Sequence, residues 1–533
     1  MVLFVIMAIT ILSLGFLSRS DVELACGQNM VLRTQMDYLA ESGLQHAKGL
    51  ILNPQDVEQE YWTGATGQQL EAGSYNYYDV VVVRDDSDPT NRCNYIIDCN
   101  SYRLKGGQEI GRSNLRAELR LDPCIALWID ASTTTTLWNG LKVYGDVYCK
   151  DGLVNQGVID GDVFASSLTG NDSEGQKYKV TDLSLTWPNV TVDGFRDKCG
   201  AYSPGDLTLS ENIDGMLLVN GNLTVQASSD VNIVAGKNLP ALYVTGDLII
   251  EKGASLDVNG LAVVDNRVLI NGDASLNVLG GLFIRDILAE TAADSSGNGN
   301  EAILYGTTRS VDGGHDALMF DGIDDYVEVE NESIFDITNQ ITVSAWIKVN
   351  AFTKSYQAIA TKGDSAWRIQ RWSSTNRIEF ACTGLSHSIP HGSLIGNINV
   401  NDGQWHHVAG VYDGTRIYLY IDGVQDVNTL TSGSIKTNDY KVMIGENAQQ
   451  RNRYWNGLID DVRVYNRALD PSEIVALPND SSLIGHWKLD EANPNVIVTA
   501  APTKTAILIG PQGAEQRWCQ AAGAFFRSVQ RKK

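Results

Sequence analysis

A loop of carboxylate and amide side chains at 294–300 is the first place where the 533-residue sequence could do chemistry. It runs from Asp294 through Ser-Ser-Gly-Asn-Gly to Asn300, and its glycines let the backbone fold around an ion and present carbonyls. Calcium prefers six to eight oxygens at ~2.3–2.6 Å. We therefore predict a calcium site from Asp294, Asn298 and Asn300, with Glu290 as a further candidate. An ordinary polar turn is the alternative.

A second group of residues could bind a ligand by stacking. Four aromatic residues fall in polar, loop-like text: Trp367, Trp372, Tyr454 and Trp455. Ligand sites are commonly lined by aromatic rings, so these four predict a platform for a sugar. Ordinary packing in a core is the alternative.

Catalysis finds little support in the sequence. Its candidates are three adjacent pairs: Asp324-Asp325, Asp460-Asp461 and His406-His407. Because neighbours in a strand point to opposite faces, only one member of each pair could reach a shared site. The G-x-S-x-G and H-E-x-x-H patterns are absent from the sequence. We expect a protein that is not an enzyme.

The elements that would position these residues are short strands joined by tight turns. Residues 341–349 alternate as a half-buried strand does, and 405–423 form a hairpin pattern around Asp-Gly. Asp470, Pro471 and Glu473 can cap and open one short helix. Many strands and a lone short helix predict a two-sheet antiparallel sandwich.

Taken in order, these motifs over 286–478 closely resemble the laminin-G-like, concanavalin A-like lectin/glucanase superfamily. The resemblance implies a jelly-roll sandwich, frequent carbohydrate binding and a calcium ion near the 294–300 loop, with Asp460 matching a second acidic position. The E-x-D-x-x-E arrangement of catalytic relatives is not found in the sandwich. The W-x-L-D-E strand that usually precedes the loop is also missing. Gly485-His-Trp-Lys-Leu-Asp-Glu491 lies after the domain, where it either begins a partial repeat or supplies the missing strand.

Residues 137–285 carry a looser repeat, in which Gly followed by Asp or Asn stands between apolar residues. Gly221, Gly246 and Gly272 lie 25 and 26 positions apart. Repeats of this size predict the stacked coils of a β-solenoid, with the Gly-Asp pairs as structural turns rather than calcium sites. A second β-sandwich is the alternative.

The first seventeen residues carry no charge and predict a membrane-spanning helix at the lower limit of length. An apolar stripe then continues to Asn53-Pro54, where proline stops the helix; its residues are Leu32, Met36, Leu39, Gly43, Ala47 and Leu50. This pattern resembles the N-terminal helix of type IV pilin-like proteins, most closely minor pseudopilins and pilus-assembly proteins. The resemblance implies that 54–136 form a small β-rich module on the helix.

Net charge narrows the range of partners. Lysine and arginine number 41 against 64 acidic residues, a formal charge of −23, which repels nucleic acid and favours cations. The eight cysteines include no C-x-x-C pair, so a zinc ribbon has no support and disulfide pairing stays open.

The sequence thus predicts a mainly β protein with an N-terminal membrane helix, a β-solenoid-like middle region, a C-terminal jelly-roll β-sandwich and an extension at 479–533. We expect a bacterial protein anchored in the cell envelope, whose sandwich binds glycan or glycoprotein with calcium support. The alternative is a structural subunit of a pilus or secretion assembly that makes only protein contacts. A glycoside hydrolase is the least favoured reading.

Overall fold

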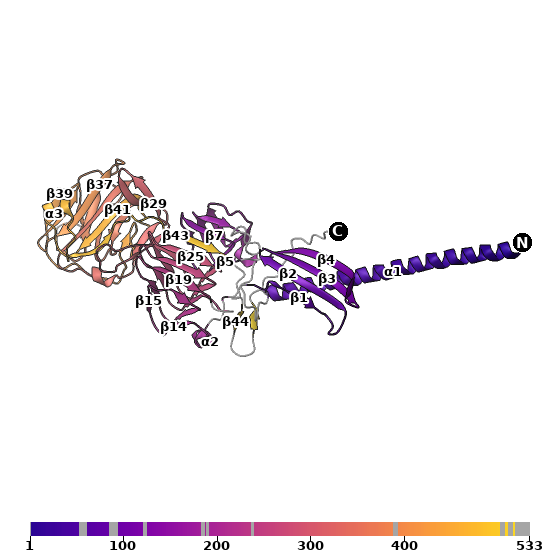
Figure 1. Cartoon of the computed structure of the whole chain (residues 1–533). Coiled ribbons are helices and arrows are strands. Elements are labelled where there is room, and N and C mark those ends of the chain that lie inside the picture. The colour runs from indigo at the N-terminus through magenta and orange to yellow at the C-terminus, as the bar shows by residue number, and fades with distance from the viewer. Residues whose placement is uncertain are drawn as a thin grey trace.

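The structure is a computed structural model that describes residues 2–52, 61–84, 94–120, 125–182, 187, 191–235, 239–386, 393–500, 507–509 and 515–517. Within these residues the chain is mainly β. A long helix, a small antiparallel sheet, a stack of parallel coils and a sandwich follow one another along one axis (Figure 1).

Helix α1 (Val2–Leu52) lies with its C-terminal half against a four-stranded antiparallel sheet. The strands, in spatial order, are β1 (Gly64–Gln68), β2 (Asn76–Arg84), β3 (Asn94–Lys105) and β4 (Gln108–Arg120). The predicted stripe is largely confirmed, since Met36, Leu39 and Ala47 are buried against the sheet. At its end Ile51 is buried in place of Leu50, which is half-exposed.

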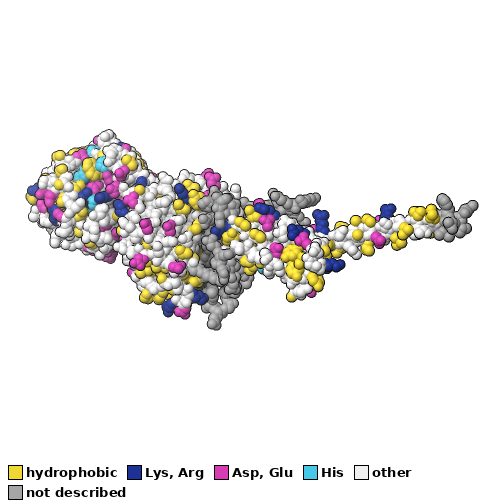
Figure 2. Space-filling view, in the orientation of Figure 1, with side chains coloured by type: hydrophobic (Ala, Val, Ile, Leu, Met, Phe, Trp, Pro, Cys, Tyr) yellow, Lys and Arg dark blue, Asp and Glu magenta, His cyan; other side chains and the backbone are white. Residues whose placement is uncertain are grey.

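The N-terminal half of α1 extends beyond the sheet as a rod with exposed apolar side chains (Figure 2). The side chains of residues 1–6 and 8, within the predicted membrane span, lie outside the described part of the structure. In the part that is described, no helix combines the length and apolar character that crossing a membrane requires.

Strands between 125 and 292, together with β43, stack in parallel in four sheets, which we call the coil stack. The first sheet contains β14 (Ala201–Ser203), β17 (Leu217–Val219), β20 (Leu242–Val244), β23 (Ala262–Val264), β26 (Leu282–Ile284), β5 (Ile125–Ile129), β8 (Asp146–Cys149), β11 (Val163–Ala165) and β13 (Lys177–Lys179). The second contains β16 (Ile213–Asp214), β19 (Asp230–Val234), β22 (Ser255–Asn259), β25 (Ser275–Leu279), β43 (Asn495–Thr499), β7 (Leu141–Tyr144) and β10 (Val158–Asp160). The third contains β15 (Leu207–Leu209), β18 (Leu223–Val225), β21 (Leu248–Ile250), β24 (Val268–Asn271) and β27 (Leu288–Ala292), while β6 (Thr135–Leu137), β9 (Gly152–Asn155) and β12 (Ser167–Gly170) form a separate three-stranded sheet.

The chain enters this stack in its middle. It winds from β5 to β13 at one end, passes through η2 (Val180–Asp182) and α2 (Val192–Phe195), and restarts at β14 at the opposite end. It then winds back until β26 pairs in parallel with β5. Trp187, on the returning segment, packs edge to face against Trp128 of β5 at 5.4 Å. This order could not be read from the repeat alone.

Stacking places like residues above one another. Leu223 pairs with Leu248, Leu248 with Val268, and Val268 with Leu288, so the coil step is 25 residues and then 20. The predicted repeat of 26 residues from Gly246 to Gly272 is therefore wrong. Gly246 does lie over Gly221, to whose carbonyl its N–H donates at 2.9 Å, whereas the next coil reaches Val268 first.

The Gly-Asp and Gly-Asn pairs are structural turns, as predicted. Asn222 Oδ1 accepts the N–H of Asp247 at 2.9 Å, and Asp247 Oδ1 accepts the N–H of Arg267 at 3.1 Å. At the other end of the stack, Asp146 Oδ1 accepts the N–H of Asp162 at 2.9 Å. Each side chain thus satisfies a backbone donor of the next coil.

The sandwich has two sheets. One continues from β27 and contains β28 (Ala302–Tyr305), β31 (Tyr326–Val329), β40 (Met443–Ile444), β33 (Ala358–Thr361), β34 (Trp367–Arg371), β35 (Ile378–Cys382) and β36 (Ser393–Ile395). The other contains β29 (Thr308–Asp312), β30 (His315–Asp321), β41 (Asn456–Tyr465), β32 (Ile341–Val349), β37 (Trp405–Tyr412), β38 (Arg416–Ile421) and β39 (Val424–Leu430), with β42 (Leu483–Trp487) paired to β41. The remaining elements are η3 (Ser333–Phe335), α3 (Pro471–Ala476), and the two-stranded pair β44 (Ile507–Ile509) and β45 (Glu515–Arg517). Helix α3 begins with the predicted capping box.

The sandwich is an insertion within one coil. The chain leaves the stack after β27 and returns as β43, between β25 and β7. Strand β42 pairs with β41, so the Gly485–Glu491 segment supplies the strand that was missing from the front of the domain. At the junction, Arg309 forms ion pairs with Glu290 and with Glu491, whose side chains are 6% and 1% exposed. This buried triad joins the two regions.

Five cysteines are described, and all are free thiols: Cys26, Cys99, Cys149, Cys199 and Cys382. The other three, Cys93, Cys124 and Cys519, lie outside the described residues.

Candidate functional site

The predicted calcium loop is closed by its own hydrogen bonds. Asp294 Oδ1 accepts the N–H groups of Ser296 at 2.9 Å and His486 at 3.0 Å. Its Oδ2 accepts the Ser296 hydroxyl at 2.7 Å and the Asn300 N–H at 3.0 Å. A carboxylate has about four lone-pair sites, so an ion at Asp294 would have to displace some of these donors.

Asn298 and Asn300, whose backbone carbonyls are the predicted ligands, use their side chains to bind strand β42. The side-chain NH₂ of Asn298 donates to the Leu483 carbonyl at 3.1 Å, and that of Asn300 donates to the Ile484 carbonyl at 2.7 Å. The Trp487 indole N–H donates to the Asn300 carbonyl at 2.7 Å. These bonds fasten the loop to the strand that the C-terminal segment supplies. Asn300 Oδ1 is buried without a hydrogen-bond partner in the described structure.

Glu290 and Asp460 have other partners. Glu290 belongs to the Arg309 triad, and Asp460 Oδ2 lies 2.6 Å from His315 Nδ1. Asp294, Asn298 and Asn300 are therefore together in one loop, while Glu290 and Asp460 are engaged elsewhere. The side chains of these five residues are engaged by other partners and do not converge on one calcium position. Calcium at this loop stays a prediction.

Two of the four predicted platform residues are core residues. Trp367 and Trp455 are both 0% exposed, and the Trp367 indole N–H donates to the Phe335 carbonyl at 3.1 Å. The prediction of a ligand platform at these two positions is wrong, because both rings pack into the hydrophobic core of the sandwich. Trp372 and Tyr454 are half-exposed.

Those two rings belong to a larger surface at one edge of the sandwich, which we call the aromatic rim: Tyr326, Tyr356, Trp372 and Tyr454, all half-exposed. Tyr356 and Trp372 meet edge to face at 5.7 Å. Arginine or lysine covers one face of each tyrosine, at 4.5–5.1 Å from the ring centres. Trp372 is the rim ring for which the described structure records no such cation, so its face suits a stacked ligand best.

A carboxylate cluster lies next to the rim. Asp321, Asp324 and Asp325 bring one oxygen each within 4.8 Å of one another. Lys354, whose amine lies over the Tyr454 ring, also reaches the Ile323 carbonyl at 3.5 Å, which links the cluster to the rim. The prediction that Asp324 and Asp325 point to opposite faces is wrong, because residues 322–325 form a turn between β30 and β31 rather than a strand.

Burial is the main reason that the pKa of Asp325 rises to about 7, and the neighbouring Asp321 adds to the rise. The Asp325 carboxylate is only 6% exposed, and its Oδ2 accepts the Asp321 N–H at 2.8 Å. Charge at this position is therefore costly unless a cation or a hydrogen-bond donor approaches it.

The sandwich sheet that contains β30, β32 and β37 carries a cluster of His315, Trp346 and Trp405 that the sequence did not predict. The His315 ring stacks on Trp405 at 4.2 Å and tilts against Trp346 at 4.9 Å. Burial raises the pKa of the Asp460 carboxyl beside it to about 6. Strand β30 supplies His315, whereas Trp346 and Trp405 come from β32 and β37, so only the sheet order brings them together.

The two histidines of the 406–407 pair separate as predicted. His406 hydrogen-bonds Asp422 at 2.9 Å and Asp402 at 3.2 Å, which anchors a hairpin. His407 packs against Trp346 at 5.3 Å, and burial lowers its pKa to about 4. They form no catalytic dyad.

Solved structures similar to this chain match about a third of it. Domain 4 of AbnA, an extracellular arabinanase of family GH43 from Geobacillus stearothermophilus solved with arabinotriose, is 21% identical, with 35% of this chain and 86% of that chain covered and a TM-score of 0.27. A putative carbohydrate binding protein from Bacteroides ovatus is 16% identical, with 33% and 51% covered and a TM-score of 0.28. The binding domain of botulinum neurotoxin serotype G is 15% identical, with 34% and 47% covered and a TM-score of 0.28. This chain spans about half the length of the last two.

A search of curated proteins returned no match for this chain. Residues 321–475, which include the rim, the carboxylate cluster and most of both sandwich sheets, match the family model of the concanavalin A-like lectin/glucanases superfamily.

Proposed function

We propose that this protein binds glycan through the aromatic rim of its sandwich and makes no covalent change to it. The observation that carries the proposal is the half-exposed pair Trp372 and Tyr356 on a rim that Lys354 links to three crowded carboxylates. Aromatic faces offer apolar contact to sugar C–H groups, and carboxylates accept hydrogen bonds from sugar hydroxyls. The family match of residues 321–475 supports the same class of ligand.

Calcium support is part of the proposal, with two places to test. The carboxylate cluster could share a cation among Asp321, Asp324 and Asp325, which would offset the cost of ionising Asp325. The loop at Asp294 would need some of its present hydrogen bonds broken first. We favour the cluster for this reason.

The remainder of the chain would hold the sandwich away from the cell. We propose that α1 anchors the protein in a bacterial envelope membrane and that the coil stack is a β-solenoid spacer. What supports this is the apolar exposed rod of α1 and the linear order of helix, stack and sandwich (Figure 1).

The test is a glycan-array screen of the full chain in calcium and again in chelator. The full chain is needed because β43 and the Arg309 triad tie the sandwich into the stack. We expect Trp372→Ala to lower the affinity of the bound glycan at least tenfold, while Tyr440→Ala, which removes an exposed aromatic ring outside the rim, leaves it unchanged.

Loss of binding in chelator that Asp324→Asn reproduces and Asp294→Asn does not would place calcium at the cluster. No binding by the wild-type chain in either condition would end the glycan proposal.

A second function has an observation of its own. The C-terminal half of α1 packs on a four-stranded antiparallel sheet, while its N-terminal half exposes Ile11, Leu14 and Phe16. These features support a subunit of a pilus or secretion assembly that packs through its helix. Assembly of the detergent-solubilised chain, lost in Leu14→Glu, would favour this function; a monomer at all concentrations would count against it.

A further inference from the structure

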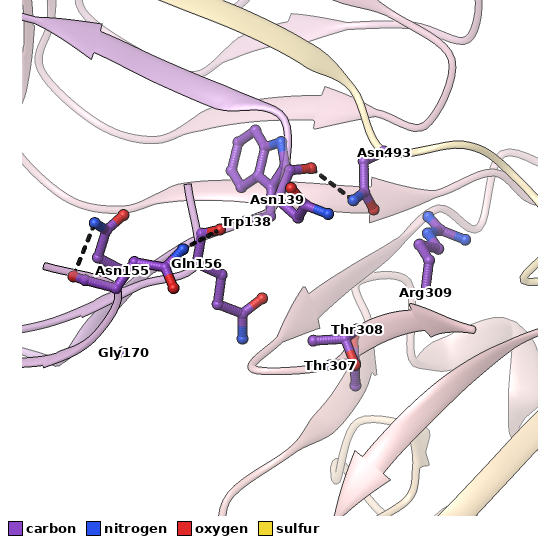
Figure 3. Close-up of a pocket in the computed structure, with 10 residues that line it drawn as sticks. Trp138, Asn139, Asn155, Gln156, Gly170, Thr307, Thr308, Arg309 and Asn493 are labelled. Carbon is purple, nitrogen blue, oxygen red and sulfur yellow. Dashed lines mark hydrogen bonds between the residues drawn. The ribbon is translucent and has the colours of Figure 1, made fainter. Parts of the chain in front are cut away.

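A cleft opens where the inserted sandwich meets the coil stack (Figure 3). Strand β27 pairs with β28 of the sandwich at its end, so the three-stranded sheet of β6, β9 and β12 stays separate from the sheet that precedes it. The cleft lies between the ends of these three strands and the start of β29. Its volume of about 410 Å³ falls within the roughly 300–1,000 Å³ of small-molecule sites.

Neutral polar groups line this cleft. Five residues with carboxamide side chains and two threonines line it, and the one formal charge among its lining residues is Arg309. That guanidinium is already engaged by Glu290, Glu491 and the Leu489 carbonyl. A ligand therefore meets no free charge among the residues that line the cleft, which disfavours phosphate, carboxylate and ammonium groups.

Part of the lining is held rigid. Asn155 donates to the Asn171 carbonyl at 3.1 Å and accepts from the Gly157 N–H at 3.0 Å. Asn493 donates to the Asn139 carbonyl at 2.6 Å. These bonds fix the positions of the cleft walls before any ligand arrives, which reduces the entropy that binding must overcome.

One hydroxyl group in the lining of the cleft lacks a hydrogen-bond partner. Thr307 Oγ1 is buried, in a residue only 8% exposed, and has no hydrogen-bond partner in the described structure. The Gln156 side chain extends into the cleft from the opposite wall (Figure 3). Buried hydroxyls nearly always have a partner, so Thr307 is an unpaired group within the cleft wall, while Thr308 beside it is exposed and offers a ligand a hydroxyl that can both donate and accept.

Trp138 supplies the apolar wall. Its indole N–H donates to the Pro494 carbonyl at 3.0 Å, which fixes the ring at the edge of the cleft. Because Trp138 is only 5% exposed, too little of its ring is open for a sugar to stack on it, and a sugar in this cleft pairs its hydroxyls with the carboxamides.

We propose that this junction cleft is a second glycan site, which takes a neutral oligosaccharide. It deepens the proposed function with a site on other elements, so the two can fail separately. A ligand bound here contacts both the coil stack and the sandwich and holds the junction in one arrangement.

The test is isothermal titration calorimetry of the full chain with cellotriose, maltotriose and arabinotriose. We expect two binding events per chain for at least one sugar. Thr308→Val and Gln156→Ala should each weaken one event about tenfold, since each removes a hydrogen-bonding group that lines the cleft. Trp372→Ala should weaken only the other. Thr208→Val, an exposed threonine on β15, is the matched control and should change neither.

Hydrogen exchange with the same sugar gives a second measurement. Amides of 152–157 and 305–309 should become protected in the wild type and in Trp372→Ala. A wild-type chain that binds none of the three sugars, or one event that only Trp372→Ala removes, overturns the cleft proposal. Protection of these segments by an extended peptide but by no sugar overturns it in favour of a protein partner.

Discussion

The coil stack and the edge of the sandwich use aspartate in opposite ways. In the stack, Asp146 and Asp247 each accept a backbone N–H of the next coil. At the sandwich edge, Asp321, Asp324 and Asp325 crowd within 4.8 Å, and burial raises one pKa to about 7. The aspartates of the stack therefore have hydrogen-bond partners within the stack. The carboxylates at the sandwich edge would be stabilised in their charged form by a ligand or a cation.

The apolar residues of the coil stack and of the aromatic rim also differ in burial and regularity. Stack positions such as Leu223, Leu248 and Val268 repeat in register, so each coil buries the face of its neighbour. Rim residues Trp372 and Tyr454 come from irregular loops and stay half-exposed. A regular scaffold that carries irregular loops is the usual division between stability and binding.

The largest expected effect concerns the link between the two regions. Arg309→Met should lower the free energy of unfolding of the sandwich by about 3–5 kcal/mol, because Glu290 and Glu491 would remain buried without a counter-charge. Urea unfolding followed by tryptophan fluorescence measures it. Arg196→Met, which removes an exposed pair with Asp193, should cost less than about 1 kcal/mol. Equal small losses in both variants would mean that the triad does not join the regions.

The next effect tests the crowded edge. The folded pKa of Asp325, about 7, lies above the ordinary value of 3.8, so the neutral form stabilises the fold. This contribution is fully present below pH ~4 and is lost as the pH rises through 7. In chelator, Asp325→Asn should match the wild type at pH 4 and exceed its free energy of unfolding by about 4 kcal/mol at pH 8.

Thermal unfolding across pH 4–8 measures this difference. Asp324→Asn, at an exposed position, is the matched control and should show a smaller change. A pH profile that Asp325→Asn leaves unaltered would remove the contrast between edge and stack.

The smallest effect concerns one turn of the stack. Asn222→Ala removes the acceptor for the Asp247 N–H and should cost about 1 kcal/mol, without altering glycan binding. Urea unfolding and the array screen read the two consequences separately. Weaker glycan binding in this variant would show that the stack takes part in recognition beyond its role as a support.

Much of the molecule follows from sequence patterns. The α1 stripe, the antiparallel sandwich and the α3 capping box all rest on local periodicity or on neighbours within four residues, and they appear where predicted. The Gly-Asp turns also follow from local chemistry, because a short acceptor after glycine can reach the backbone of the next coil.

The candidate sites were harder to predict from the sequence. Trp367 and Trp455 stand in polar, loop-like text, and only the packing of the sandwich shows that they belong to its core. Asp324 and Asp325 were assigned to a strand, whereas a turn brings both to one cluster. The rim and the His315 group join residues that are far apart along the chain.

Several strands, the buried face of α1 and the polar loops can be predicted from the sequence, because they depend on local spacing and side-chain chemistry. Only the tertiary structure decided that the chain enters the coil stack in its middle, that the sandwich is inserted before β43, and that β42 completes it. Those choices depend on pairing between strands up to hundreds of residues apart, where apolar strands of similar pattern are interchangeable until packing selects one order.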